Sequence, residues 1–318
     1  MNKALGSLLA VALAAASLAA QAAYPERPIK LVVGFGAGGG ADSVARALAD
    51  AMGRTLGQPV VVDNKPGAGT TLAASVVARA PADGYTLMML TSTNTISPLM
   101  YKSLKYDPAT AFDMVSTVAR GPLLIAVSKA SGIATLSDLV ARARKDPGKL
   151  NYGAGGVGTT PHLAALVLQR EAGISMVHVP YKGGNETAMA LVGGQIDVQF
   201  GTPPAVDPIV SRANILAVTT ASRSDLAPGV PAAAETLKGY EVTSWYGIGG
   251  PAGMPKETVN RLAKAVHAAL ADQSLLQQFK LLGVEAAPSS PTQADKLYAD
   301  ELSRWYEVVR RENLSADN

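Results

Sequence analysis

The stretch Val33-Gly34-Phe35-Gly36-Ala37-Gly38-Gly39-Gly40-Ala41-Asp42 decides the fold of this 318-residue chain. A β-branched run at residues 29–33 precedes the glycines, and apolar residues at helical spacing follow them through residues 42–52. In a glycine-rich turn between a strand and a helix, backbone N–H groups point into open space at the N-terminus of the helix. The helix dipole is positive there, which suits an anion. The stretch therefore predicts an α/β unit with an anion-binding site at the start of its first helix.

A second glycine-rich turn, at residues 153–158, repeats this arrangement. It follows a strand-like run at residues 150–152, and Thr160-Pro161 begins the next helix with a hydroxyl cap and a proline in the first position. Ligands of open parallel sheets bind beyond the carboxyl ends of the strands, where both turns are expected. Two such turns predict opposite walls of one cleft, in which backbone N–H groups hold a carboxylate by charge-assisted hydrogen bonds.

The rest of the chain alternates strand and helix patterns, which predicts an α/β fold of two similar lobes. Each lobe is expected to be a mainly parallel sheet flanked by helices, with lobe one formed by residues 23–123 plus 246–318 and lobe two by residues 124–245. Thr70, Asn185 and either Thr135 or Ser137 are predicted helix caps. Strands are expected at residues 29–33, 59–63, 85–90, 123–127, 150–152, 176–179, 197–200, 215–219 and 245–249, and further helices at residues 70–80, 137–145, 185–191, 256–272 and 291–311.

The N-terminus predicts export. Lys3 precedes an apolar stretch at residues 5–20, and Ala20-Gln21-Ala22 is a small-x-small cleavage site, so residues 1–22 are interpreted as a signal peptide. A membrane anchor is the alternative, but the stretch is short for a membrane span. The net charge of +3 is too balanced for a nucleic-acid-binding protein. The chain has no cysteine, which excludes disulfides, thiolate metal sites and a cysteine nucleophile, and no His/Asp/Glu cluster has the spacing of a metal site.

Two enzyme classes remain as alternatives. Gly34-x-Gly36-x-x-Gly39 satisfies the dinucleotide-binding fingerprint, and Asp63 ends the second strand, although it lies nearer thirty than twenty residues downstream. Export argues against a nicotinamide cofactor. An exported hydrolase would need a base from His162, His178 or His267, and the chain has no Gly-x-Ser-x-Gly motif. We expect His162 to pack near the second turn, His178 to be structural and His267 to face solvent.

Motifs along nearly the whole mature chain resemble those of the Bug family, the substrate-binding proteins of tripartite tricarboxylate transporters. The matching segments are Tyr24-Pro25-Glu26-Arg27-Pro28-Ile29, residues 33–42, 57–69, 83–87, 147–152, 162–164 and 178–183, Leu216-Ala217-Val218-Thr219, and Pro251-Ala252-Gly253-Met254-Pro255.

This resemblance implies a type II-like periplasmic binding protein, a two-lobed "Venus flytrap" without catalytic activity or cofactor. It implies a monomer that holds a small organic carboxylate between two strand-to-helix turns, partly through ordered water, and delivers it to a membrane permease. The positions that match the family's site are Phe35, Gly36, Gly39, Gly40, Asp42, Gly156, Gly158, Thr159, Thr160, His162, Tyr181, Lys182 and Gly183. Thr91, Ser92 and Asn94 add polar groups after the third strand, and Gly201 is included because relatives often carry an acidic residue there.

Departures from the family pattern bear on the ligand. Relatives commonly have serine at the position of Ala154, and Ala-Pro where this chain has Asn185-Glu186. An acidic residue in place of Gly201 would pair with an amino group, so its loss favours a dicarboxylate or an aromatic carboxylate without an ammonium group. Glu186 would replace that acid if it faces the cleft.

Overall fold

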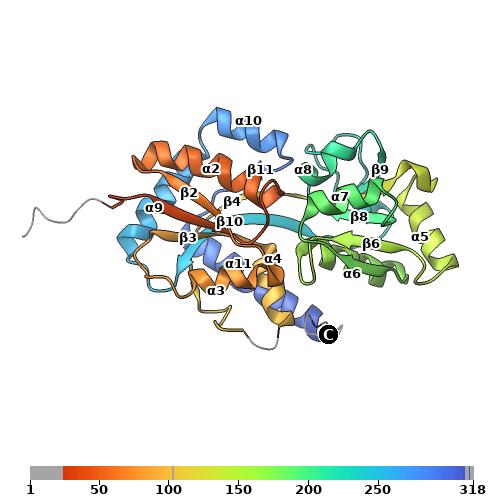
Figure 1. Ribbon diagram of the computed structural model, residues 1–318, viewed down its shortest axis with the longest axis horizontal. Helices are drawn as coiled ribbons and strands as arrows, with labels where there is room; N and C mark the ends of the chain where they lie inside the picture. Colours follow the sequence, from red (N-terminus) through yellow and green to blue (C-terminus); the bar gives the residue numbers. More distant parts are fainter. Residues whose placement is uncertain (1–23, 102–103, 312–314, 316–318) are drawn as a thin grey trace, which may run out of the picture.

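The computed structural model describes residues 24–101, 104–311 and 315, so the expected signal peptide lies outside the described residues. The chain forms two α/β lobes that lie side by side, each a sheet flanked by helices (Figure 1). In the described residues, no helix is both long and apolar enough to span a membrane.

The first lobe contains a six-stranded sheet with the order β11-β4-β10-β3-β1-β2. Residues 29–91 supply its parallel part, because helices α2 and α3 carry the chain back between successive strands. The strands are β1 (Ile29–Val33), β2 (Val60–Asn64), β3 (Thr86–Thr91), β4 (Phe112–Pro122), β10 (Thr243–Pro251) and β11 (Glu285–Ala286). Five helices accompany them, namely α2 (Gly40–Leu56), α3 (Thr71–Val77), α9 (Lys256–Ala269), α10 (Gln273–Leu281) and α11 (Pro291–Arg311), with the short α4 (Ser92–Ile96) after β3.

The second lobe contains a five-stranded sheet with the order β7-β6-β8-β5-β9. Its strands are β5 (Leu124–Ser128), β6 (Asn151–Ala154), β7 (Val177–Pro180), β8 (Val198–Gly201) and β9 (Ala213–Val218). Its helices are α5 (Leu136–Lys145), α6 (Thr160–Ala172), α7 (Gly184–Val192) and the short α8 (Pro203–Val206). The predicted α/β architecture with two lobes is therefore confirmed.

Both sheets are mixed, which corrects the expectation of mainly parallel sheets. β10 returns from the second lobe and runs antiparallel to β3 and β4, and β5 runs antiparallel to β8 and β9. In each lobe, the parallel strands joined by helices all run in one direction. A strand that enters from the other lobe begins at the end of the sheet where those strands finish, so it runs antiparallel to them. The sequence analysis also missed β4 and α10 altogether.

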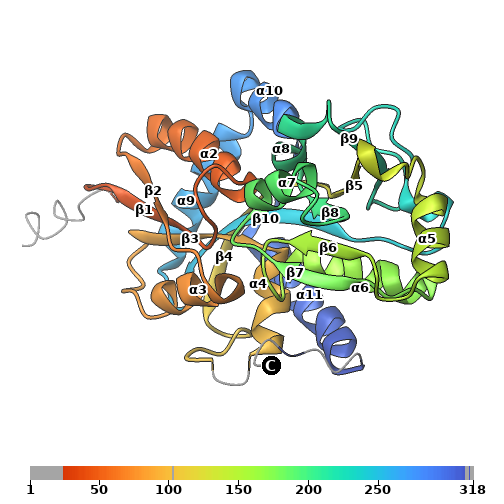
Figure 2. The same cartoon turned by 45° about the vertical axis from the view of Figure 1, so that its right-hand side comes forward.

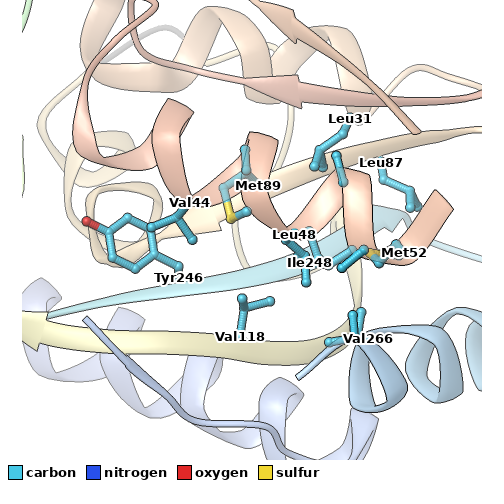
Figure 3. Close-up of a cluster of buried hydrophobic side chains, with 14 of the residues drawn as sticks. Leu31, Val44, Leu48, Met52, Leu87, Met89, Val118, Tyr246, Ile248 and Val266 are labelled. Carbon is cyan, nitrogen blue, oxygen red and sulfur yellow. The ribbon is translucent and has the colours of Figure 1, made fainter. Parts of the chain in front are cut away.

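Apolar side chains fill the space between each sheet and its helices. In the first lobe, α2 packs its buried face on β1, β3 and β10, with α9 against the same cluster (Figure 3). A smaller cluster joins the lobes: Ile96 and Met100 of lobe one contact Leu163 of α6 together with Trp305 and Val309 of α11. The C-terminal helix thus lies beside α4 and α6 at the boundary (Figure 2).

The helix caps follow the predictions only in part. Thr135 caps α5, because its hydroxyl accepts from Asp138 N at 3.1 Å. Thr70 has a positive φ of 75° and makes no capping bond; its hydroxyl instead accepts from Asn94 Nδ2 at 3.0 Å. Asn185 does not cap α7 either, since the N-cap is Gly183 without a side-chain bond.

Candidate functional site

A cavity of about 170 Å³ lies between the two lobes, which is small for a ligand site. Both glycine turns contribute to its wall, as the sequence predicted. The lining residues are Phe35, Gly36, Ala37, Gly39, Gly40, Ala41, Thr91, Thr93, Leu123, Gly155, Thr159, Thr160, Pro161, Lys182, Gly183, Gly184, Asn185, Glu186, Phe200, Gly201, Thr202, Ala205, Ser244 and Tyr246.

Asp42 braces the first glycine turn from behind and does not line the cavity. Its Oδ2 accepts from Gly38 N at 2.8 Å and from Arg46 Nε at 2.9 Å, and its Oδ1 accepts from Asn64 Nδ2 at 2.9 Å. Asn64 also donates to the carbonyl of Phe35 at 3.0 Å. Burial of the carboxyl acts to raise its pKa, but the bonds from Arg46, Gly38 and Asn64 outweigh burial and lower the pKa. The buried carboxylate therefore holds the turn in shape.

His162 braces the second glycine turn in a similar way. Its ring Nδ1 accepts from Gly158 N at 3.2 Å, and the backbone N–H of His162 donates to Thr159 Oγ1 at 3.5 Å. Thr159 also donates to Gly156 O at 2.9 Å. The N-cap of α6 is thus Thr159, one residue before the expected Thr160. The packing role expected for His162 agrees with these contacts.

Two histidine rings stack beneath this turn. His162 and His178 lie with ring centroids 4.2 Å apart, and Tyr152 stacks on His178 at 5.1 Å. Burial lowers the pKa of His162 to about 3, with a further contribution from His178, and burial lowers the pKa of His178 to about 4. Both rings are therefore neutral at neutral pH, which suits packing and leaves His162 Nδ1 free to accept.

The neutral stack predicts that acid destabilises the fold. Since the pKa of His162 falls from 6.5 to about 3 on folding, the unfolded chain binds more protons below pH 6.5. The free energy of unfolding should therefore fall as the pH drops from about 6.5 toward 3, with about 2 kcal/mol lost at pH 5 through His162 alone. Urea unfolding at pH 7.5 and pH 5 measures this loss. The free energy of unfolding should fall between the two pH values by about 2 kcal/mol less in His162→Gln than in the wild type.

His267→Gln serves as the control, because that ring lies on the exposed side of α9. This variant leaves the stacked rings of His162 and His178 in place, so the loss of stability attributed to His162 should persist in it. Equal wild-type stability at pH 5 and pH 7.5 would contradict the assignment of a buried neutral His162.

A seam of hydroxyl groups joins α4 of lobe one to α6 of lobe two. Ser92 Oγ lies 2.7 Å from Thr160 Oγ1, and Thr93 Oγ1 lies 3.1 Å from the same atom. Thr160 N donates to Thr93 Oγ1 at 3.2 Å. All three side chains are buried, so this side of the boundary is closed to water. Ser92 belongs to the seam rather than to the cavity wall.

Free backbone donors in the cavity lie at α2 and α7. In the first turn of α6, Thr160 N bonds to Thr93, residue 161 is proline, and His162 N bonds to Thr159. By contrast, neither α2 nor α7 has a side-chain cap. Among the described residues, the N–H groups with no hydrogen-bond partner include those of Gly40, Ala41, Gly184 and Asn185. The sequence analysis gave the second turn this role and did not expect α7.

Two hydroxyl side chains converge on the start of α2. A Cβ atom at Gly40 would lie 2.8 Å from Thr202 Oγ1 and 3.3 Å from the Tyr246 hydroxyl, so only glycine fits. Figure 3 shows Tyr246 at the edge of the core cluster with its hydroxyl oxygen pointing away from the other labelled side chains. Thr202 follows β8 of lobe two, whereas Tyr246 lies on β10. Both lobes therefore place polar groups beside the N-terminus of α2.

Two charged side chains line the cavity, both beside α7. Lys182 precedes the helix, and Glu186 Oε2 accepts from Lys182 N at 3.1 Å. The sequence analysis left open whether Glu186 faces the cleft, and the structure places it in the wall. In the described part of the chain, no group of three or more His, Cys, Asp or Glu residues could hold a metal ion.

The structure brings most of the predicted site residues to one cavity. Those in its wall are Phe35, Gly36, Gly39, Gly40, Thr91, Thr159, Thr160, Lys182, Gly183 and Gly201. Those outside the wall are Asp42, Ser92, Gly156, Gly158, His162 and Tyr181. For both groups of residues, contact with a ligand stays a prediction.

Several wall residues were not predicted. Thr93 lies within the polar run after β3 that the sequence showed, so it could have been found. Nothing local marked Leu123, Phe200, Thr202, Ser244 and Tyr246, which come to the cavity through strands that lie far apart in the sequence.

Comparison with known proteins gives a consistent result. The family described as "Tripartite tricarboxylate transporter family receptor" matches residues 44–314. The structure is similar to that of the periplasmic binding protein BugD, with 32% identity, a TM-score of 0.86, and coverage of 92% of this chain and 99% of that one.

Two similar structures carry a named ligand. R. palustris Rpa4515 with adipate is 34% identical, with a TM-score of 0.87 and coverage of 92% of this chain and 99% of that chain. MatC from Rhodopseudomonas palustris with bound malate is 30% identical, with a TM-score of 0.84 and coverage of 90% and 100%.

Proposed function

Because the chain belongs to the tripartite tricarboxylate transporter receptor family, we propose that it captures a small organic carboxylate between its lobes and delivers it to a membrane permease of that transporter type. The family is one of solute-binding receptors, so the chain is a receptor and not an enzyme. This sets aside the dinucleotide-binding and hydrolase alternatives. Periplasmic location after cleavage of residues 1–22, a monomeric state and the lobe limits given above are part of the proposal.

The cavity wall carries the argument for an anionic ligand. The residues whose N–H groups lack partners at the start of α2 and α7 line a small space between the lobes, and helix N-termini favour a negative charge. Phe35, which is only partly buried, supplies apolar surface for a carbon skeleton, with the buried side chains of Leu123 and Phe200 behind the wall. Relatives with adipate and malate support a carboxylate in this fold.

The cavity also bears on the choice of carboxylate. Glu186 already places a carboxylate beside the first turn of α7, where it accepts from Lys182 N. If the ligand has a second carboxylate and places it beside α7, the negative charge of Glu186 would repel that carboxylate, whereas the positive charge of Lys182 would attract it. The proposal covers mono-, di- and aromatic carboxylates.

Thermal unfolding with adipate, malate and benzoate tests the proposal. A ligand present at about 100 times its Kd stabilises the folded state by about 2.7 kcal/mol, which is several degrees in Tm. Hexane-1,6-diol, which matches adipate in length but lacks charge, should give no shift.

Three outcomes count against the proposal. They are the absence of any shift with a panel of mono-, di- and aromatic carboxylates, an equal shift with the diol, and hydrolysis of an ester or amide under the same conditions. The last would favour the hydrolase alternative.

A further inference from the structure

One side chain of α7 crosses the cleft at the cavity. Asn185 Nδ2 donates to the carbonyl oxygen of Gly38 at 3.1 Å, which joins lobe two to the first glycine turn of lobe one. Asn185 lines the cavity, and its side chain is exposed. The amide that was expected to cap its own helix thus forms a bond between the lobes instead.

The acceptor of this bond is held rigidly. Gly38 has a φ of +79°, and its N–H donates to the buried carboxylate of Asp42 at 2.8 Å. A Cβ atom at Gly38 would lie 3.3 Å from Asn185 Nδ2, so the glycine allows the amide to approach closely. The carbonyl therefore points at Asn185 in a fixed direction, braced by Asp42 and Asn64 behind the turn.

The position of the bond differs from that of the other polar contacts between the lobes. The hydroxyl seam formed by Ser92, Thr93 and Thr160 is buried, whereas Asn185 is exposed. The cavity is bounded by both, because Thr93, Thr160 and Asn185 all line it. A second exposed bond, from Arg304 Nη2 to Glu241 O at 3.4 Å, also joins residues of the two lobes, but neither residue lines the cavity. The Asn185 bond is therefore a contact beside the cavity that water can replace when the lobes separate.

We propose that Asn185 is a positioning residue that latches the closed lobes and sets the rate of ligand release. With the bond formed, the first turn of α7 lies against the first glycine turn, so the residues that carry free N–H groups in α2 and α7 line the same space. In the open form both partners bond to water, and the net effect of one neutral hydrogen bond is modest. The closed-to-open ratio should fall about fivefold without the latch, the factor that about 1 kcal/mol corresponds to.

This inference rests on the proposed function for its second measurement only. Two variants remove the donor: Asn185→Ala deletes the amide, and Asn185→Asp keeps its shape but cannot donate to a carbonyl. Met189→Ala is the matched control, since Met189 lies one turn further along α7, is 65% exposed and does not line the cavity between the lobes. All three variants should fold as the wild type does.

The first measurement needs no ligand. Because the chain has no cysteine, nitroxide labels can be placed at Thr55→Cys on α2 and Ala141→Cys on α5, both exposed and in different lobes. Pulsed electron spin resonance then gives the distribution of distances between the lobes. In both Asn185 variants the ratio of the short-distance (closed) to the long-distance (open) population should fall about fivefold. Met189→Ala should leave the distribution unchanged.

The second measurement is the release of adipate followed by stopped flow. Release should become about fivefold faster in both Asn185 variants, while the association rate stays within about twofold, because the open form that captures ligand lacks the bond. This split separates a latch from a general loss of structure. If the ligand-free wild type lies fully open, the release rate decides. If adipate does not bind, a carboxylate that stabilises the wild type takes its place. If no carboxylate of the panel binds, the proposed ligand class is in doubt and the distance distribution decides.

The inference is overturned if neither the distance distribution nor the release rate changes in Asn185→Ala and Asn185→Asp. It is also overturned if Met189→Ala shows the same changes, or if only the association rate falls.

Discussion

Valine in place of Gly158 is expected to reduce ligand-induced thermal stabilisation strongly. Gly158 has a φ of +78°, which a β-branched residue rarely adopts, and a Cβ there would lie 3.1 Å from Ser97 Cα and 3.3 Å from Met100 Sδ. Both neighbours belong to lobe one, so the added side chain would push the lobes apart. Strain of about 1–3 kcal/mol in the closed form lowers affinity by about 5- to 160-fold.

Gly173→Val is the matched control for this substitution. Gly173 ends the same helix with a φ of +60°, but a Cβ there would meet no atom within 4 Å. It should cost similar backbone strain while leaving the shift in Tm with adipate, or with another carboxylate that stabilises the wild type, intact. A wild-type shift in Gly158→Val, or equal losses in both variants, would show that the second turn does not control closure.

Alanine in place of Asp42 is expected to have the largest effect on stability. The buried carboxylate accepts from Gly38 N, Arg46 and Asn64, and its removal deletes all three hydrogen bonds, although Gly38 and Arg46 are exposed and their donors can turn to water. We expect a loss of about 1–3 kcal/mol in the free energy of unfolding, measured by urea at pH 7. Ligand binding should weaken as well, because the first glycine turn loses its brace.

The pH dependence gives a second check on Asp42. Its folded-state pKa lies below the ordinary value of 3.8, so its contribution is complete above that pH and disappears as the pH falls through the lower folded value. The difference in the free energy of unfolding between the wild type and Asp42→Ala should therefore become smaller as the pH falls below 3.8. Asp50→Ala on the same helix, where an exposed carboxylate pairs with Arg54, should change stability by less than about 1 kcal/mol. A small effect of Asp42→Ala would refute the bracing role.

Local sequence patterns predicted the parts of the molecule that short-range physics determines. The two glycine turns, the strands before them and the cap Thr135 all depend on residues within a few positions of one another. The prediction failed where partners lie far apart in the chain. Asn185 looked like a cap because its local position favours one, yet its partner Gly38 lies 147 residues away.

The candidate site shows the same division. Phe35 and Thr159 were found because they adjoin the glycine turns. Thr202 and Tyr246 were not, because they approach Gly40 through β8 and β10, whose place beside α2 follows from the sheet order and the docking of the lobes. The reversed direction of β10 was missed for a related reason, since no pattern within a strand states the direction from which the chain arrives.

The junction between β4 and β5 bears on what ligand capture costs in entropy. Leu123 alone separates Pro122 from Leu124; it is fully buried, its N–H donates to Thr219 Oγ1 at 2.9 Å and its carbonyl accepts from Thr219 N at 3.0 Å. A connection this short and this well bonded samples few conformations before a solute arrives. Little chain freedom is therefore surrendered there on binding, and more of the interaction free energy appears as affinity.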